Sequence, residues 1–152
     1  GICLGMLLLM TESHEYGRHQ GLNLIEGEVL KLEEPTGSPR ALKVPHVGWN
    51  AIYPLTPSNV PHIHDTASEP SWGGSLLEGL GSGESMYFVH SFYCRPIDAQ
   101  VGLSLTRYGS IEFCSAIRSR NITGIQFHPE RSGPAGLRIY RNLSTIVTQT
   151  KQ

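Results

Sequence analysis

Apolar and polar positions alternate along much of the chain in the way that is typical of β-strands. The runs LIEGEVLKL, ALKVPHVGW and SMYFVHSFY carry apolar residues at strand spacing, and the turn-rich stretch EEPTGSPR separates the first two. Further along, QVGLSLTRYGSIEFCSAIRSRNITGIQFHPE predicts three strands with turns at YGS and SRN. The pattern therefore predicts several strands, with an antiparallel section in the second half of the chain.

Two segments carry apolar residues at helical spacing. GICLG has the form of a strand end, a tight turn and a helix start, and residues 7–10 supply the apolar face. This predicted helix turns polar in TESHEYG and stops at Gly17. AGLRIYRNLSTIVTQ places Leu137, Tyr140 and Leu143 at helical spacing, which predicts a closing amphipathic helix.

The stretch between the strands near Tyr53 and Ser85 is rich in Pro, Gly and Ser. We interpret residues 54–85 as a long loop. No internal repeat and no second domain boundary stand out. The sequence predicts a single α/β domain over residues 1–152.

Composition and charge narrow the class of protein. The 152 residues are 39% hydrophobic, which is enough for a core, and the formal net charge of −1 gives no reason to expect nucleic acid or an anionic membrane as a partner. No stretch has the length of a membrane span or the form of a signal peptide. Three widely spaced cysteines favour a reducing cytoplasm over a disulfide scaffold, with Cys94 and Cys114 as packing residues.

Cys3 lies in the pentapeptide GICLG, which has the G-x-C-x-G form of a nucleophile elbow. In such an elbow small flanking residues avoid clashes, and the following helix start favours a thiolate and offers the N–H of Leu4 to an oxyanion. The alternative is a buried cysteine in a glycine-flanked turn. The pentapeptide alone leaves both open.

A histidine at a strand exit strengthens the interpretation of Cys3 as a nucleophile. His128 in GIQFHPE follows a strand-like run, and Glu130 comes two residues later, where a carboxylate can fix the imidazole tautomer. The alternative is a surface turn. With Cys3, these residues predict a Cys–His–Glu triad.

Other polar positions carry weaker signals. Trp49 in PHVGWN is as consistent with a core residue as with an interface anchor, and His90 in FVHSF is more typical of a satisfied structural histidine. HIHD at residues 62–65 offers two histidines on one strand face but no third ligand with convincing spacing. We therefore expect no metal and no cofactor.

GICLGM, GLNLIEGEV, VPHVGWN, MYFVHSFY and GIQFHPERSGPAGL occur in this order, and together they resemble class I, triad-type glutamine amidotransferases. VPHVGWN and MYFVHSFY point to the glutamine amidotransferase subunits of imidazole glycerol phosphate synthase. The resemblance implies an α/β, flavodoxin-like fold of three layers with a central mixed sheet. The stretch from Tyr53 to Gly74 resembles an insertion.

The resemblance also implies roles for individual residues. Cys3 would attack the side-chain amide of glutamine, His128 would act as general base and then acid, and Glu130 would orient it. Ammonia would pass to a (β/α)₈ cyclase subunit that makes imidazole glycerol phosphate in histidine biosynthesis. Positions that would hold glutamine are Leu4, Gly5, Glu15, Ser91 and Phe92. Positions that would contact the partner are His46, Trp49 and Asn50.

Two departures from the family pattern bear on these expectations. The family carries Gln where this chain has Leu7, and a Leu offers bound glutamine no hydrogen bond. The family also has strands before the elbow, so we expect this chain to be a piece that lacks the N-terminal strands. Two other functions stay open: an amidotransferase subunit for another synthase, such as one that modifies surface sugars, and a catalytically impaired interaction subunit.

Overall fold

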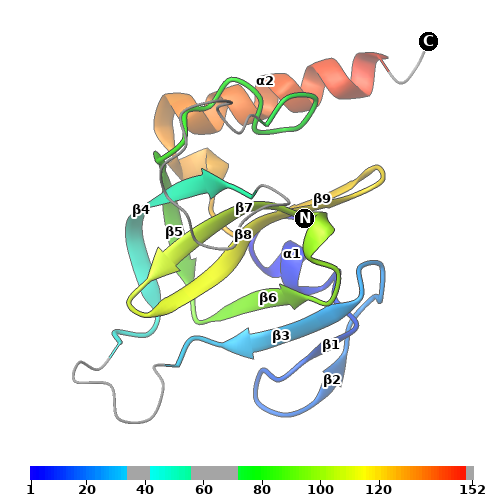
Figure 1. The fold of residues 1–152 in the computed structure, drawn as a ribbon, viewed down its shortest axis with the longest axis vertical. Coiled ribbons are helices and arrows are strands. Elements are labelled where there is room, and N and C mark those ends of the chain that lie inside the picture. The colour runs from blue at the N-terminus through cyan, green and yellow to red at the C-terminus, as the bar shows by residue number, and fades with distance from the viewer. Residues whose placement is uncertain (34–41, 56–71, 150–152) are drawn as a thin grey trace.

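The computed structural model describes residues 1–33, 42–55 and 72–149, and its strands form one mixed sheet (Figure 1). Along the sheet the order is β2-β1-β3-β6-β8-β7-β4-β5, and β9 pairs with β8. The strands are β1 Glu12–Ser13, β2 His19–Gln20, β3 Gly27–Lys31, β4 His46–Pro54, β5 Glu84–His90, β6 Phe92–Pro96, β7 Gly102–Tyr108, β8 Ile111–Ser119 and β9 Ile122–Ile125. The helical elements are α1 Leu4–Leu7, η1 Ala99–Val101, η2 Pro129–Arg131 and α2 Gly133–Gln149, where η marks a 3₁₀ helix.

The three strands predicted in the second half of the chain are confirmed as β7, β8 and β9. Two-residue turns join them antiparallel, at Gly109–Ser110 and at Arg120–Asn121. Gly109 has φ 62° and Arg120 has φ 54°, the left-handed conformation that tight hairpins require. The sequence signal was strong here because the turn residues and the alternation agree.

MYFVHSFY does not form the single strand that its apolar pattern predicts. The chain breaks at Ser91, because β5 pairs with β4 whereas β6 pairs with β3. The N–H of Leu32 donates to the Ser91 carbonyl at 2.8 Å, which holds the break in place. We call residues 90–92 the β5–β6 bend.

The helix predicted from GICLG to Gly17 is also too long, since α1 ends at Leu7. Beyond it, the N–H of Thr11 donates to the Gly27 carbonyl and the N–H of His14 donates to the Val29 carbonyl. These bonds draw the segment into the sheet beside β3, where β1 runs parallel to it. Sheet pairing therefore overrides the local helical pattern.

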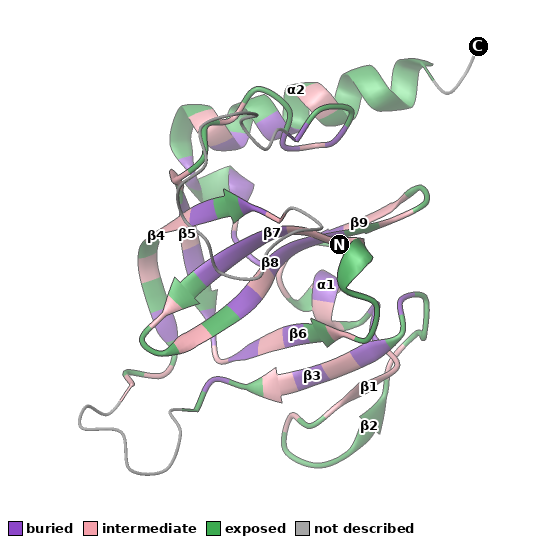
Figure 2. Ribbon diagram, in the orientation of Figure 1, coloured by how far each residue is buried: buried purple, intermediate pink, exposed green. Residues whose placement is uncertain are grey.

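Buried residues, purple in Figure 2, occur on β3, β5, β7, β8 and α2. The buried apolar residues form two clusters. On β5 the alternation is regular: Met86, Phe88 and His90 point inward, and Val89 is exposed. The larger cluster contains Leu32, Ile52, Trp72, Leu77, Met86, Phe88, Phe113, Ala116, Ile125, Phe127 and Ile139. The smaller one lies around α1 and contains Met6, Leu9, Met10, Ile25, Val29, Phe92, Cys94 and Ile117.

The closing helix is confirmed as α2, but its predicted apolar face is not the buried one. Leu137, Tyr140 and Leu143 are exposed, whereas Ile139 enters the larger cluster. Gly136 lies against the Pro129 carbonyl, where a Cβ would overlap it. Close packing at Gly136 and Ile139 thus sets which side of α2 faces the sheet.

The region expected to be a long loop, residues 54–85, lies partly outside the described residues, since 56–71 are not described. From Trp72 onward the chain runs beside α2, where the Asn142 side chain donates to the Leu76 carbonyl at 2.9 Å (Figure 1). In the part of the chain that is described, no helix is both long and apolar enough to cross a membrane.

Candidate active site

Cys3 lies at a sharp turn between a short sheet contact and α1. Ile2 forms a parallel bridge to Ile125, the last residue of β9, and the Cys3 N–H donates to the Ile125 carbonyl at 2.8 Å. Cys3 itself has φ 49° and ψ −109°, outside the regions that an L-residue ordinarily occupies. Such backbone strain is typical of functional positions, and the geometry is that of a nucleophile elbow.

The two glycines of the elbow differ in what they contribute. A Cβ on Gly1 would overlap the Gly5 carbonyl, so the first position tolerates only glycine. A Cβ on Gly5 would meet nothing within 4 Å. The steric argument for small flanking residues therefore holds for Gly1 and is wrong for Gly5.

His128 is held by its backbone just after β9. Its N–H donates to the Tyr87 carbonyl of β5 at 2.8 Å, and its carbonyl accepts the Ser132 hydroxyl at 2.6 Å. The same Ser132 oxygen accepts the Tyr87 N–H at 3.0 Å. This closed set of hydrogen bonds fixes the backbone position from which the His128 side chain extends.

The tautomer of His128 follows from its partner. Nδ1 lies 2.7 Å from a Glu130 carboxylate oxygen, which only accepts, so Nδ1 carries the proton. Nε2 of the neutral ring is then an acceptor. It is buried, and among the described residues it has no hydrogen-bond partner. A buried acceptor without a partner is costly in a structural role and expected in a general base.

The Cys3 thiol lies among weak polar contacts. It donates to the Val89 carbonyl at 3.7 Å, and the Gln126 amide donates to its sulfur at 3.8 Å. Burial is the largest influence and raises the pKa of Cys3, while the Leu4 N–H and Gln126 act to lower it. The helix start thus acts in the expected direction through the Leu4 N–H, but burial outweighs it, so this thiol needs a base.

A pocket of about 360 Å³ opens beside the thiol. Four of the five positions expected to hold glutamine line it, together with Cys3, and Gly5 is not among the described residues that do. The lining residues are Cys3, Leu4, Leu7, Glu15, Tyr16, Pro45, Val89, His90, Ser91 and Phe92.

Sequence reasoning missed Gln126, and it favoured a structural role for His90 over a catalytic one. Gln126 is fully buried and touches Cys3, and His90 lies in the pocket lining. A signal for Gln126 was present: it stands two residues before His128, and alternate residues of an extended segment share a face.

The three positions expected at a partner interface lie on two faces of β4. Trp49 is 59% exposed and packs edge-on against Tyr87 of β5. His46 is 3% exposed on the opposite face, and Asn50 shares that face. Only Trp49 of the three presents its side chain outward.

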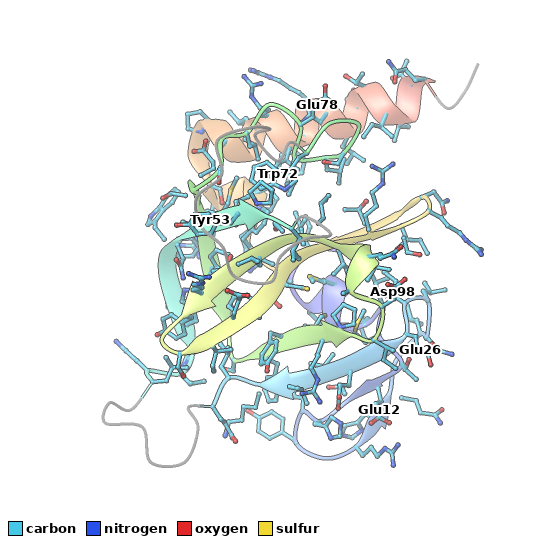
Figure 3. All side chains as sticks on the ribbon, in the orientation of Figure 1. Glu12, Glu26, Tyr53, Trp72, Glu78 and Asp98 are labelled. Atoms are coloured by element: carbon cyan, nitrogen blue, oxygen red, sulfur yellow. The ribbon has the colours of Figure 1, made fainter. Side chains whose placement is uncertain are left out.

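Candidate metal ligands are found in two places. HIHD at residues 62–65 lies outside the described residues. Glu12, His14 and Glu28 gather at the end of the sheet away from α2, where Figure 3 shows Glu12. The two carboxylates already hold Arg18 and Arg95, so we interpret this group as an ion-pair network.

Comparison with known proteins places this site in a family. The model of class-I glutamine amidotransferases matches residues 1–145. Proteins named imidazole glycerol phosphate synthase subunit HisH are similar over nearly the whole chain. The one from Syntrophotalea carbinolica is 44% identical over 96% of this chain and 63% of its own length. Those from Archaeoglobus fulgidus and Moorella thermoacetica are 42% and 38% identical over 97% of this chain, and over 63% and 59% of their own lengths.

The chain belongs to the class-I glutamine amidotransferase family. It spans about 60% of the length of these curated relatives. The α/β class predicted from the sequence is confirmed.

Proposed function

We propose that this chain carries the glutaminase centre of an imidazole glycerol phosphate synthase, within a single amidotransferase domain over residues 1–152. Two observations carry the proposal: a cysteine on a strained elbow, and a half-buried histidine whose buried Nε2 has no hydrogen-bond partner among the described residues. Three relatives that carry the synthase subunit name support the choice of synthase.

In the proposed reaction His128 Nε2 takes the proton of the Cys3 thiol as sulfur attacks the side-chain carbonyl carbon of glutamine. The Leu4 N–H faces the developing oxyanion. The imidazolium then donates its proton to the leaving amine, so ammonia departs and a glutamyl thioester remains. Water, deprotonated by the same Nε2, hydrolyses the thioester and releases glutamate. Throughout, Glu130 holds Nδ1–H and balances the imidazolium charge.

Glutamine would occupy the pocket beside Cys3. Leu4, Glu15, Ser91 and Phe92 line that pocket, which supports their assignment to substrate binding. Gly5 would act through the elbow backbone, since the Gly5 N–H donates to the Ile2 carbonyl at 2.8 Å. We propose that the reaction needs neither a metal nor a cofactor, because thiol, imidazole and carboxylate supply every proton transfer.

Ammonia would pass to a (β/α)₈ cyclase subunit in the cytoplasm, where it enters imidazole glycerol phosphate. The outward face of β4 and β5 suits such a partner. Val47, Trp49 and Val89 are 54%, 59% and 37% exposed on it, and Val47 pairs with Val89. An exposed apolar patch next to the site is typical of a protein interface. In this proposal Trp49 contacts the partner directly, and His46 and Asn50 contribute from behind the strand.

Leu7 favours a second candidate. It lines the pocket where the family carries Gln, so the substrate loses a donor or acceptor there. A subunit that serves a different synthase, or one with impaired glutaminase activity, would fit this change. Rescue of a histidine auxotroph lacking its own amidotransferase subunit separates these from the first candidate.

The direct test measures glutamate release from glutamine by the full chain, alone and with a cyclase subunit. We expect release that Cys3→Ser reduces by at least about a thousandfold, since a serine hydroxyl is a far weaker nucleophile beside this base. Cys114→Ser is the matched control, because burial raises the pKa of Cys114 to about 11 and leaves it a poor nucleophile. Equal turnover by the wild-type chain and Cys3→Ser would refute the proposal.

A further inference from the structure

A chain of hydrogen bonds runs behind the pocket through two buried histidines. His46 Nδ1 lies 3.0 Å from His90 Nε2, and Asn50 Nδ2 lies 3.3 Å from His46 Nε2. At the far end, His90 Nδ1 lies 2.9 Å from the Phe92 carbonyl oxygen. We call Asn50, His46 and His90 the relay.

The direction of every bond in the relay follows from its ends. The Phe92 carbonyl only accepts, so His90 Nδ1 carries a proton, and Nε2 of the neutral ring must accept. His46 Nδ1 must therefore donate to His90, which leaves His46 Nε2 as an acceptor. Both rings hold the Nδ1–H tautomer.

Asn50 fixes the other end independently. Its Oδ1 accepts the Ala51 N–H at 2.8 Å, and its Nδ2 donates to the Arg107 carbonyl at 2.8 Å. An amide flipped by 180° would break both bonds. The second Nδ2 hydrogen is left for His46 Nε2, which needs a donor. The two ends thus demand the same direction.

The two histidines of the relay are buried, and Asn50 lies half-exposed at its end. The His46 ring stacks with the rings of Phe88 and Tyr108, whose centroids lie 5.0 and 3.9 Å away. His46 and His90 are 3% and 6% exposed. A buried polar group with one fixed set of partners specifies one arrangement of the backbone around it.

The end of the relay is the β5–β6 bend, and that bend lines the pocket. Leu32 holds the Ser91 carbonyl and His90 holds the next carbonyl, so the two peptide planes of the bend are set from different elements. His90, Ser91 and Phe92 all line the pocket beside Cys3. Anything that turns the Phe92 carbonyl therefore turns the wall of the pocket.

We propose that the relay positions bound glutamine. It orients the Phe92 peptide from the face of β4 opposite to Trp49. His46 and Asn50 thereby influence substrate binding without touching the substrate. That the bound molecule is glutamine rests on the function proposed above. Two neighbours on β4 therefore have different roles. Trp49 faces outward, whereas Asn50 lies on the other face and reaches the pocket lining by way of His46 and His90.

The test uses an isosteric change that removes both hydrogen bonds that the Asn50 amide donates, to His46 and to the Arg107 carbonyl. Asn50→Asp replaces a donor by a carboxylate that only accepts, so His46 either gains a second proton or inverts its tautomer and loses His90. Asn142→Asp is the matched control, since the Asn142 amide also donates to two carbonyls, those of Leu76 and Glu78, beside α2.

Two measurements are made on the full chain. Imidazole ¹⁵N NMR, with resonances assigned from His46→Gln and His90→Gln, reports the tautomers. Inactivation by a chloroketone analogue of glutamine, against inactivation by iodoacetamide, separates pocket binding from thiol reactivity. We expect two Nδ1–H rings in the wild-type chain. In Asn50→Asp we expect the half-saturating analogue concentration to rise by about three- to tenfold, with the iodoacetamide rate unchanged. Asn142→Asp should leave both as in the wild-type chain.

An Nε2–H ring at either histidine of the wild-type chain would overturn the relay. Equal effects of Asn50→Asp and Asn142→Asp on half-saturation, or an equal slowing of iodoacetamide and analogue, would overturn its positioning role. If the analogue does not saturate the wild-type chain at all, the glutamine assignment falls together with the proposed function, while the tautomers still decide whether the relay exists.

Discussion

The histidine of the candidate triad and the two histidines of the relay differ in how their ring nitrogens are used. His128 Nε2 is buried without a partner among the described residues, and Cys3 has only contacts of 3.7–3.8 Å. By contrast, every nitrogen of His46 and His90 has a partner at 3.3 Å or less. Within the described part of the chain, His128 thus keeps one ring nitrogen without a hydrogen bond, whereas His46 and His90 use both of theirs.

This difference teaches how a sequence divides its histidines between chemistry and structure. A saturated imidazole has its proton positions fixed and cannot accept another proton without breaking a bond. An imidazole with one free nitrogen can exchange a proton with a neighbour. The count of unused nitrogens, read from geometry, distinguishes the two roles better than burial does.

The largest effect is expected at Glu130, the partner of His128 Nδ1. Glu130→Gln keeps an acceptor for His128 Nδ1–H and removes the charge that balances an imidazolium. We expect kcat for glutamate release to fall by about a hundredfold with little change in KM. Steady-state kinetics measure this. Glu112→Gln, which removes an exposed carboxylate on β8 paired with Arg107, should have no effect, and a similar loss in both variants would argue against a special role for Glu130.

The second prediction concerns His46 and His90, which should make stability depend on pH. Burial lowers the pKa of His46 and of His90 from 6.5 to about 4. Between pH 6.5 and pH 4 the unfolded chain therefore binds protons at these histidines that the folded chain does not bind. Their contribution to the free energy of unfolding is complete above about pH 6.5 and is lost as the pH falls towards 4. We expect the free energy of unfolding in urea to drop by about 4 kcal/mol between pH 7 and pH 5, because each of the two rings contributes about 1.4 kcal/mol per pH unit below pH 6.5.

Two variants sharpen that measurement. His46→Gln should flatten the pH dependence, whereas His19→Gln on the exposed strand β2 should retain it. An unchanged slope in His46→Gln would mean that the relay histidines do not carry the effect.

Leu7 offers a gain-of-function prediction. Leu7→Gln returns a polar side chain to the pocket lining, and we expect KM for glutamine to fall by about fivefold with kcat little changed. Leu8→Gln is the matched control, because Leu8 is 49% exposed and does not line the pocket. If Leu7→Gln leaves KM unchanged, Leu7 does not limit substrate capture.

The smallest effect is expected at Gln126. Gln126→Leu removes the amide that donates to Cys3, so the pKa of the thiol should rise further and alkylation by iodoacetamide at pH 8 should slow by a few fold. The unpartnered Gln126 oxygen is removed as well, so stability should not fall. A pH profile of alkylation, with Gln20→Leu as the exposed control, checks this. A faster reaction in Gln126→Leu would contradict the assignment.

The sequence predicted the elements whose local signals agree with their surroundings. GxCxG located the elbow, YGS and SRN located two hairpins, and the strand exit located His128. The MYFVHSFY run misled because alternation does not report which neighbour a strand pairs with, and β5 and β6 pair with different strands. The helix after Cys3 misled because partners in β3, about fifteen residues later, capture its backbone.

For the site, residue types were predictable and contacts were not. Cys3, His128 and Glu130 were picked out from spacing, and four of five expected substrate positions line the pocket. The relay was not predictable, because its direction depends on carbonyls of Phe92 and Arg107 that any residue type would supply. The resemblance assigns His46, Trp49 and Asn50 together to the partner interface, and β-strand alternation puts His46 and Asn50 on the face of β4 opposite to Trp49.

The bridge between Ile2 and Ile125 has a consequence for how this site varies among sequences. Cys3 and His128 are separated by most of the chain, yet both are reached from Ile125: its carbonyl receives the Cys3 N–H, and three residues on the strand exit presents the imidazole. The spacing of nucleophile and base is therefore a local property of one backbone contact. A change in chain length between Cys3 and His128 would therefore leave their placement unchanged as long as this backbone contact is kept.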